Sequence, residues 1–157
     1  MTSDDCVFCR IARGELEASR VVESDALLAI MDTDPVTPGH VLVMPKAHLP
    51  ALSDLSDDVA NEMFAVARRV AAALRRAPLR CEGVNLLYAD GEAAQQEVFH
   101  AHLHVVPRYP GDGFTVDARW GSDPSREQLD AHAEAIRASL DDASGEDGHR
   151  ASAERSG

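Results

Sequence analysis

The sequence has little of three things: aromatic side chains, long apolar runs and positive charge. Aromatic residues make up only 4% of the 157 residues, although the hydrophobic content of 45% is ordinary for a globular protein. No apolar run approaches the roughly 20 residues of a membrane-spanning helix, and the first residues are polar, without the character of a secretion signal. A net charge of −12 would repel the phosphates of DNA or RNA, but it still permits a small nucleotide held at a local site. We therefore expect a cytoplasmic protein with no membrane or nucleic-acid partner.

Cysteine is also scarce. The chain has three cysteines, two of them in the close pair Cys6 and Cys9, which argues against a disulfide framework. A CxxC pair alone leaves three alternatives open: incidental thiols, a redox pair or half of a zinc site. A redox motif would follow a strand and begin a helix, whereas only a polar stretch precedes this pair. A closed zinc site needs two further ligands, for which the sequence offers His48 and His100.

The chain is long enough for one domain with a substantial core and too short for two. We expect a single domain over residues 1–140 and a disordered polar tail over residues 141–157. Apolar positions at steps of three and four predict a long helix over residues 56–76, and a second helix is expected over residues 125–140, with Ser125 or Asp123 near its N-cap. Apolar segments between turn signals predict strands at residues 21–23, 26–31, 40–44, 82–88 and 99–108. Together they predict an α+β fold with a mostly antiparallel sheet.

Three histidines alternate with apolar residues in the first part of the last predicted strand segment. In an extended strand, His100, His102 and His104 would share one face at a repeat of about 6.6 Å, while Ala101 and Leu103 would face a core. Imidazole can be a nucleophile, a proton carrier or a metal ligand near neutral pH, so such a row suits chemistry on phosphate. An exposed histidine-rich strand or a metal-chelating patch is the blander alternative, and so strict an alternation argues against it.

Several segments together resemble the histidine-triad (HIT) nucleotide-binding and hydrolase family, in its zinc-containing bacterial type. The resemblance runs from about residue 6 to residue 109, and its most specific part is Gln-Glu-Val-Phe-His-Ala-His-Leu-His-Val-Val-Pro-Arg at residues 96–108. The other matching segments are Cys-Val-Phe-Cys-Arg-Ile-Ala-Arg-Gly-Glu (6–15), Ala-Ile-Met-Asp (29–32), Pro-Gly-His-Val-Leu-Val-Met-Pro-Lys-Ala-His (38–48) and Asp-Gly-Glu-Ala-Ala (90–94). The resemblance implies a HIT-like α+β fold with a mostly antiparallel five-stranded sheet, one long helix, a short N-terminal helical segment and a C-terminal helix.

The resemblance implies a nucleotidyl hydrolase or transferase that cleaves at the α-phosphate of a nucleoside phosphoramidate or a dinucleoside polyphosphate. In this family the central histidine, here His102, attacks the α-phosphorus and forms a nucleotidyl-histidine that water or another acceptor resolves. His104, His40 and His100 would complete the catalytic set. Asp32 matches the acidic residue that accepts hydrogen bonds from the ribose hydroxyls. The implied substrate-binding set is Asp32, Asn85, Gln96, His102 and His104.

The resemblance also implies a structural zinc ion and a homodimer. Related proteins place zinc on a CxxC pair, a histidine after a Pro-Lys segment and the first histidine of the triad. These positions correspond to Cys6, Cys9, His48 and His100. Such an ion would fix the N-terminal segment to the triad and orient His100 beside the nucleophile, without taking part in the reaction.

Three positions depart from the family pattern. Ala89 stands where many members have Asn or Gln, Gln95 where the motif has Gly, and Glu97 where some members have Ser or Thr. These residues leave the nucleophile intact but alter the expected phosphate cradle. The alternative function is therefore a nucleotide (AMP)-binding or sensing protein with little turnover. A third hypothesis is a zinc-stabilised interaction protein in which the triad serves metal and structure alone.

Overall fold

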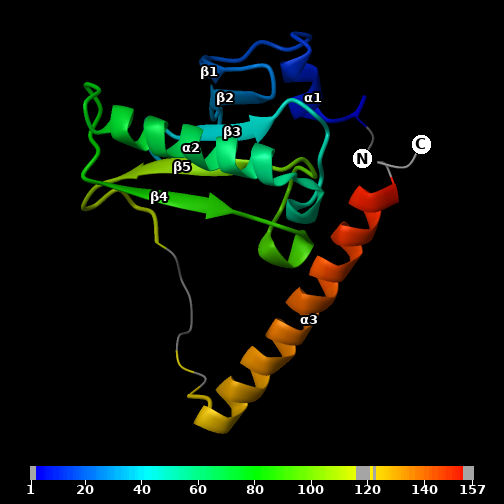
Figure 1. The fold of residues 1–157 in the computed structure, drawn as a ribbon. Helices are drawn as coiled ribbons and strands as arrows, with labels where there is room; N and C mark the ends of the chain where they lie inside the picture. The colour runs from blue at the N-terminus through cyan, green and yellow to red at the C-terminus, as the bar shows by residue number, and fades with distance from the viewer. Residues whose placement is uncertain (1–2, 116–120, 122, 154–157) are drawn as a thin grey trace. The chain divides into compact units, whose positions relative to one another are not determined.

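A computed structural model gives a five-stranded antiparallel sheet with the strand order β1-β2-β3-β5-β4 (Figure 1). The structure describes residues 3–115, 121 and 123–153, with side chains no further than residue 140. The strands are β1 (Arg20–Glu23), β2 (Leu27–Met31), β3 (Val41–Pro45), β4 (Gly83–Tyr88) and β5 (Leu103–Arg108). The helices are α1 (Val7–Ala12), α2 (Asp57–Leu74) and α3 (Arg126–Ala153), with short 3₁₀ turns at η1 (Leu52–Asp54) and η2 (Glu92–Ala94). The α+β fold and the antiparallel five-stranded sheet are thus confirmed.

The central strands β2 and β3 are buried on both faces. Because successive side chains alternate between faces, one face of this pair packs with α2 and the other with α1. The face toward α2 presents Leu27, Ala29, Val41 and Val43. The face toward α1 presents Leu28, Ile30, Leu42 and Met44, which cluster with Phe8 and Ile11. The short helix α1 therefore closes a second, smaller core.

Helix α2 lies across one face of the sheet, as Figure 1 shows. The Val59 N–H donates to the Ser56 hydroxyl at 3.4 Å, and Asp57 and Asp58 place negative charge in the first turn, where the helix dipole favours it. The buried stripe follows the predicted spacing: Met63, Val66, Ala67, Val70 and Leu74. The helix ends at Leu74, so the expected range of 56–76 was about one residue too long at the start and two at the end.

The last strand is shorter than the sequence predicts. Strand β5 begins at Leu103, so His100 and His102 precede it, and only His104 belongs to the ladder, opposite Leu42 of β3. The chain departs from the sheet because the Ala101 N–H donates to the Leu49 carbonyl at 2.6 Å, outside β3. The expected strand over residues 99–102 was therefore wrong, and the three imidazoles do not form one regular row.

The chain divides into two units, Met1–Thr115 and Val116–Gly157. The second contains α3, which begins with reciprocal hydrogen bonds: the Gln128 N–H donates to the Ser125 hydroxyl, and the Ser125 N–H to the Gln128 side-chain oxygen. The helix continues past residue 140 to Ala153, and residues 154–157 lie outside the described residues. Disorder of the polar tail stays a prediction. The division after Thr115 also differs from the expected domain boundary at residue 140. In the part of the chain that the structure describes, no helix is long and apolar enough to cross a membrane.

Candidate active site and metal centre

A cavity of about 340 Å³ lies where α1, the end of β2 and the segment before β5 meet. This volume falls within the roughly 300–1,000 Å³ of small-molecule sites. Its apolar lining consists of Val7, Phe8, Ile11, Ala18, Ile30, Met31, Leu42, Ala89 and Val98. Its polar lining consists of Glu17, Asp32, Thr33, Gln95, Glu97, His102 and His104. An apolar wall opposite a few convergent polar groups is typical of a binding site for a small molecule with an aromatic part.

His102 is held so that one ring nitrogen remains free. Its Nδ1 lies 2.7 Å from the His100 carbonyl oxygen, and a carbonyl can only accept a hydrogen bond. In the neutral ring Nδ1 therefore carries the proton, and Nε2 keeps an unprotonated lone pair. The ring packs edge-on to Phe8, with centroids 5.1 Å apart, and lines the cavity. These contacts fix a buried imidazole as a nucleophile or base.

A chain of three polar side chains runs from the cavity toward the end of β2. His104 Nδ1 lies 2.9 Å from His40 Nε2, and His40 Nδ1 lies 3.2 Å from an Asp32 carboxylate oxygen. The sheet places them together, because the Asp32 N–H donates to the His40 carbonyl and His104 lies on the adjacent strand. The Val36 N–H lies 3.3 Å from the same Nδ1 of His40. It can donate only to an unprotonated Nδ1, whereas the Asp32 carboxylate can accept only from a protonated one. The proton on His40, and with it the tautomer of His104, thus depends on Asp32.

Burial keeps this chain of imidazoles uncharged. Burial lowers the pKa of His104 to about 4, with a smaller effect in the same direction from His102 and His40. Burial also lowers the pKa of His40, which Asp32 partly offsets. Both rings are consequently neutral near pH 7, so each has one donor and one acceptor nitrogen to offer.

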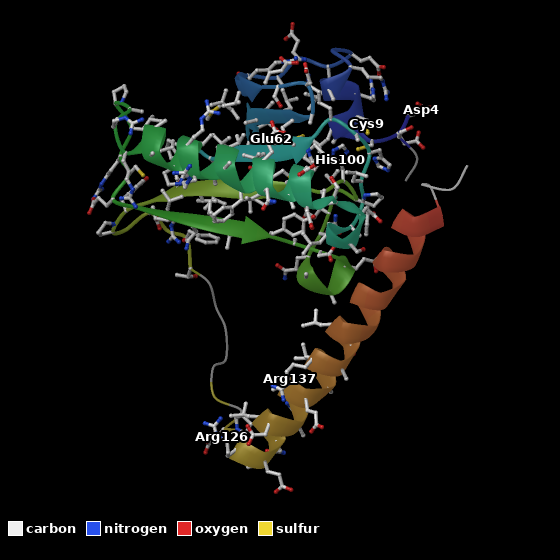
Figure 2. The ribbon with its side chains drawn as sticks, viewed as in Figure 1. Asp4, Cys9, Glu62, His100, Arg126 and Arg137 are labelled. Carbon is white, nitrogen blue, oxygen red and sulfur yellow. The ribbon has the colours of Figure 1, made fainter. Side chains whose placement is uncertain are left out.

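A second cluster, on the other side of His102, joins the two cysteines of the CxxC pair to two histidines. One ligand atom each from Cys6, Cys9, His48 and His100 lies within 4.8 Å of the others. Figure 2 shows Cys9 beside His100. Three sulfur–nitrogen distances in the cluster are 3.3, 3.4 and 3.5 Å. A tetrahedral zinc ion with Zn–S of about 2.3 Å and Zn–N of about 2.0 Å would separate such ligands by about 3.5 Å, so the donor set fits the ion.

The surroundings of the cluster prepare it for a metal. The Nε2–H of His100 donates to the Pro45 carbonyl at 2.8 Å, which leaves Nδ1 unprotonated and directed at both sulfurs. Burial, followed by the hydrogen bond and charge of Cys6, raises the pKa of the Cys9 thiol to about 11. A cation would reverse that effect by stabilising the thiolate, so metal binding here would release protons.

Not every predicted site residue lies at the cavity. The Asn85 side chain accepts a hydrogen bond from Arg108 near the start of β4 and does not line this cavity, so a role in substrate binding stays a prediction. Gln96 is buried behind the cavity, where its amide bridges the Gly91 N–H and the Pro50 carbonyl. Gln96 therefore shapes the loop before the triad instead of lining the site. His100 belongs to the cysteine cluster and contacts the His102 ring through its main-chain carbonyl.

The three departures from the family pattern, Ala89, Gln95 and Glu97, all line the cavity. Gln95 has a positive φ of 66°, a left-handed conformation that glycine adopts without strain. This conformation explains why the motif has Gly there. Sequence reasoning missed the apolar wall from α1, although Val7 and Phe8 stand between the cysteines and Ile11 follows them by two positions.

Comparisons with known proteins agree with this geometry. A family model described as the HIT domain matches residues 13–111. A solved HIT family protein from Bacillus anthracis is 39% identical with a TM-score of 0.80, over 88% of this chain and 99% of that one. A zinc-bound histidine triad protein from Mycobacterium smegmatis is 42% identical with a TM-score of 0.69, over 90% of this chain and 99% of that one. An adenylylsulfatase from Arabidopsis thaliana is 38% identical over 109 residues, which cover 69% of this chain and 55% of that protein.

The family motif and the structure coincide on the same residues. The matched region includes the hydrogen-bonded histidines, the cavity lining other than its α1 residues, and two of the four residues of the cysteine cluster. The rest of the lining and of the cluster, from Cys6 to Ile11, stands just before it. The chain belongs to the HIT family.

Proposed function

We propose that the protein is a nucleotidyl hydrolase or transferase that acts at an α-phosphorus through a nucleotidyl-histidine on His102. The observation that carries the proposal is the 2.7 Å hydrogen bond from His102 Nδ1 to the His100 carbonyl, which leaves a free Nε2 at a cavity of nucleotide size. In the first step Nε2 forms a bond to phosphorus while the bond to the leaving group breaks. In the second step water or another acceptor forms a bond to phosphorus, loses a proton and releases His102.

The other polar groups of the cavity take complementary roles in this proposal. His104, neutral and hydrogen-bonded to His40, contacts the phosphate oxygens. The Asp32 carboxylate lines the same cavity and accepts hydrogen bonds from the ribose hydroxyls. The apolar wall from Phe8 and Ile11 covers the base. An adenylyl group as the transferred unit agrees with the similarity to an adenylylsulfatase.

We further propose that Cys6, Cys9, His48 and His100 hold a structural zinc ion. The spacing of their ligand atoms and the similarity to a zinc-bound relative support this assignment. Bound zinc would supply a rigid tetrahedral link between α1 and the triad segment. The chain itself supplies the orientation of His100 through the Pro45 carbonyl.

Intact-mass spectrometry tests the proposed intermediate. Adenosine phosphoramidate or a diadenosine polyphosphate, mixed with the protein and quenched rapidly, should add one adenylyl group. The substitution His102→Ala should abolish the adduct and lower turnover at least about a thousandfold. The matched control is His132→Ala, on the exposed face of α3. Equal turnover by wild type and His102→Ala would refute the proposal.

A second candidate is a nucleotide-binding protein with little turnover. It is favoured by one observation: the departures Ala89, Gln95 and Glu97 all lie at the cavity. Calorimetry should then show AMP binding while no adduct forms with any substrate of the panel. A trapped adenylyl adduct would reject this alternative.

The proposal includes a homodimer. Strand β4 lies at an edge of the sheet, and beside it an apolar groove of about 460 Å³ includes Phe64 of α2, whose side chain is 59% exposed. In the described residues, the Tyr88 hydroxyl in this groove is buried with no hydrogen-bond partner. A second copy of the chain would cover both features. Light scattering should give a dimeric mass for the wild type. The substitution Phe64→Asp should reduce this mass, whereas the control Val21→Asp, on β1, should not. A monomeric mass for the wild type would exclude the dimer.

A further inference from the structure

The charge of the cavity is one-sided. Three carboxylates line it, from Glu17, Asp32 and Glu97, and no lysine or arginine among the described residues does. Glu17 and Glu97 are exposed and therefore lie at the rim, whereas the Asp32 side chain is only 17% exposed. The remaining polar side chains of the cavity, His102, His104, Thr33 and Gln95, can contact phosphate, but none of them supplies the fixed positive charge of a lysine or arginine.

The charges around the cavity affect the α-phosphate and the leaving group, on the two sides of the scissile bond, differently. The α-phosphate lies against His102, which presents the lone pair of Nε2, and against His104, whose ring is neutral near pH 7. A leaving group made of further phosphates would extend past these rings with several negative charges and no cationic side chain to meet them. Like charges near a partly enclosed, low-dielectric site repel more strongly than in bulk water. A neutral or cationic leaving group would meet no such repulsion, and a cationic one would be attracted.

We propose that Glu17 and Glu97 form an acidic rim that sets the leaving-group preference of the site. The rim selects a neutral or cationic amine joined to the α-phosphate and disfavours a polyphosphate. This inference rests on the proposed function, because it assumes the attack by His102. In the favoured reaction, His102 Nε2 bonds to phosphorus as the phosphorus–nitrogen bond breaks. The nitrogen leaves with the bonding pair and takes a proton from water.

Steady-state kinetics test the rim. The probes are an adenosine 5′-phosphoramidate bearing an aminoalkyl tail and diadenosine tetraphosphate, without added divalent cations. The measured quantity is the ratio of kcat/KM for the two probes in wild type, Glu17→Gln, Glu97→Gln and the double variant. We expect the wild-type ratio to favour the cationic probe, each substitution to lower it about threefold or more, and high salt to reduce the difference. The control is Glu92→Gln, an exposed carboxylate of η2 that does not line the cavity.

Two results would overturn the inference: an unchanged ratio in the double variant, or an equal change in Glu92→Gln. Nucleotide binding to the His102→Ala variant tests the acidic rim without turnover. It therefore distinguishes failure of the rim from failure of the proposed reaction. In that background, affinity should fall from AMP to ADP to ATP, and Glu17→Gln with Glu97→Gln should flatten the fall. ATP bound as tightly as AMP by the variant that keeps both glutamates would reject the rim, whether or not an adenylyl adduct forms in the wild type.

Discussion

At the scale of the residue, the three histidines of the triad differ through their partners. His100 presents Nδ1 to two sulfurs, His102 donates from Nδ1 to a carbonyl, and His104 shares a hydrogen bond with His40. A backbone acceptor and a buried neighbour are enough to give chemically identical rings different free nitrogens, which suit the ligand, nucleophile and phosphate-contact roles that we propose for them.

Acid should destabilise the protein through His104. Its pKa is about 4 in the folded state and about 6.5 when unfolded, so between these values only the unfolded chain binds the proton. The stabilising contribution is complete above about pH 6.5 and is lost as pH falls toward 4; the lowered pKa of His40 acts in the same direction. Urea unfolding between about pH 7 and pH 4.5 should show a steeper loss for wild type than for His104→Gln. A parallel loss in both proteins would contradict this prediction, and His132→Gln should behave as wild type.

The left-handed backbone at Gln95 gives a second prediction. Replacing Gln95 by Gly should raise the free energy of unfolding by up to about 1 kcal/mol, because φ of 66° strains a residue with a Cβ atom. Replacing Ala94, in η2, by Gly should lower it by a similar amount. Denaturant unfolding of the two variants provides the comparison. A Gln95→Gly protein less stable than wild type would show that contacts of the glutamine side chain outweigh the strain.

At the scale of the element, we expect the short helix α1 to depend on metal binding at the cysteine cluster. It has only six residues, too few to be stable alone, and it supplies Val7, Phe8 and Ile11 to the cavity. The substitution Cys9→Ser should remove zinc from the purified protein and lower Tm by about 5 °C or more. It should also weaken AMP binding, since the cavity wall is no longer anchored. Cys81→Ser, which keeps all four ligands, should change neither zinc content nor AMP affinity.

Elemental analysis and calorimetry check this prediction. A Cys9→Ser protein that still carries one zinc per chain would place the metal elsewhere. Full AMP affinity after loss of zinc would mean that the apolar contacts of Phe8 and Ile11 alone hold α1 against the sheet.

The sequence predicted the elements whose apolar spacing reflects burial. The stripe of α2 and the strands β2 and β3 were found within two residues because each packs against a core. The start of β5 was missed, since alternation continues through His100 and His102 although their backbone bonds elsewhere. The end of α3 was missed for another reason: a polar helix satisfies its own backbone, so periodicity does not show where it ends.

The family motifs identified residues of the site, but the sequence did not reveal several contacts between distant segments. The four residues Cys6, Cys9, His48 and His100 meet as expected. The two cysteines lie at the start of α1 and within it, and the two histidines lie in the segments that follow β3 and precede β5. The contact between Asn85 and Arg108 was not expected, because Arg108 lies on the neighbouring strand and no local pattern reveals that pairing. Glu17 was not singled out because a lone exposed carboxylate in a loop carries no signal in the sequence.

At the scale of the whole molecule, the first unit contains everything that the site needs. Both hydrophobic clusters, the cysteine cluster and the cavity lie between residues 6 and 106. The chain beyond β5 is fixed by Arg108, which pairs with Asp112 and donates to the Phe114 carbonyl. These contacts end just before the division after Thr115.

A chain truncated after Thr115 should therefore fold. We expect it to unfold cooperatively, to bind zinc and to form the adenylyl adduct. A chain truncated after Tyr109 loses the Arg108–Asp112 pair and should unfold at a lower temperature. Thermal unfolding and intact-mass spectrometry of both fragments decide the matter; failure of the longer fragment to fold would show that residues after Thr115 contribute to the core.

The hydrogen bond between His102 Nδ1 and the carbonyl of residue 100 does not depend on which side chain stands at residue 100. That carbonyl belongs to the main chain, so no side-chain substitution at residue 100 can delete it. A variant such as His100→Ala would lose a metal ligand, yet the main chain would still assign the proton to Nδ1 of His102 and the lone pair to Nε2. The side chain of residue 100 thus affects the proposed metal site, and its main-chain carbonyl affects the protonation of His102. A substitution can change the first without changing the second.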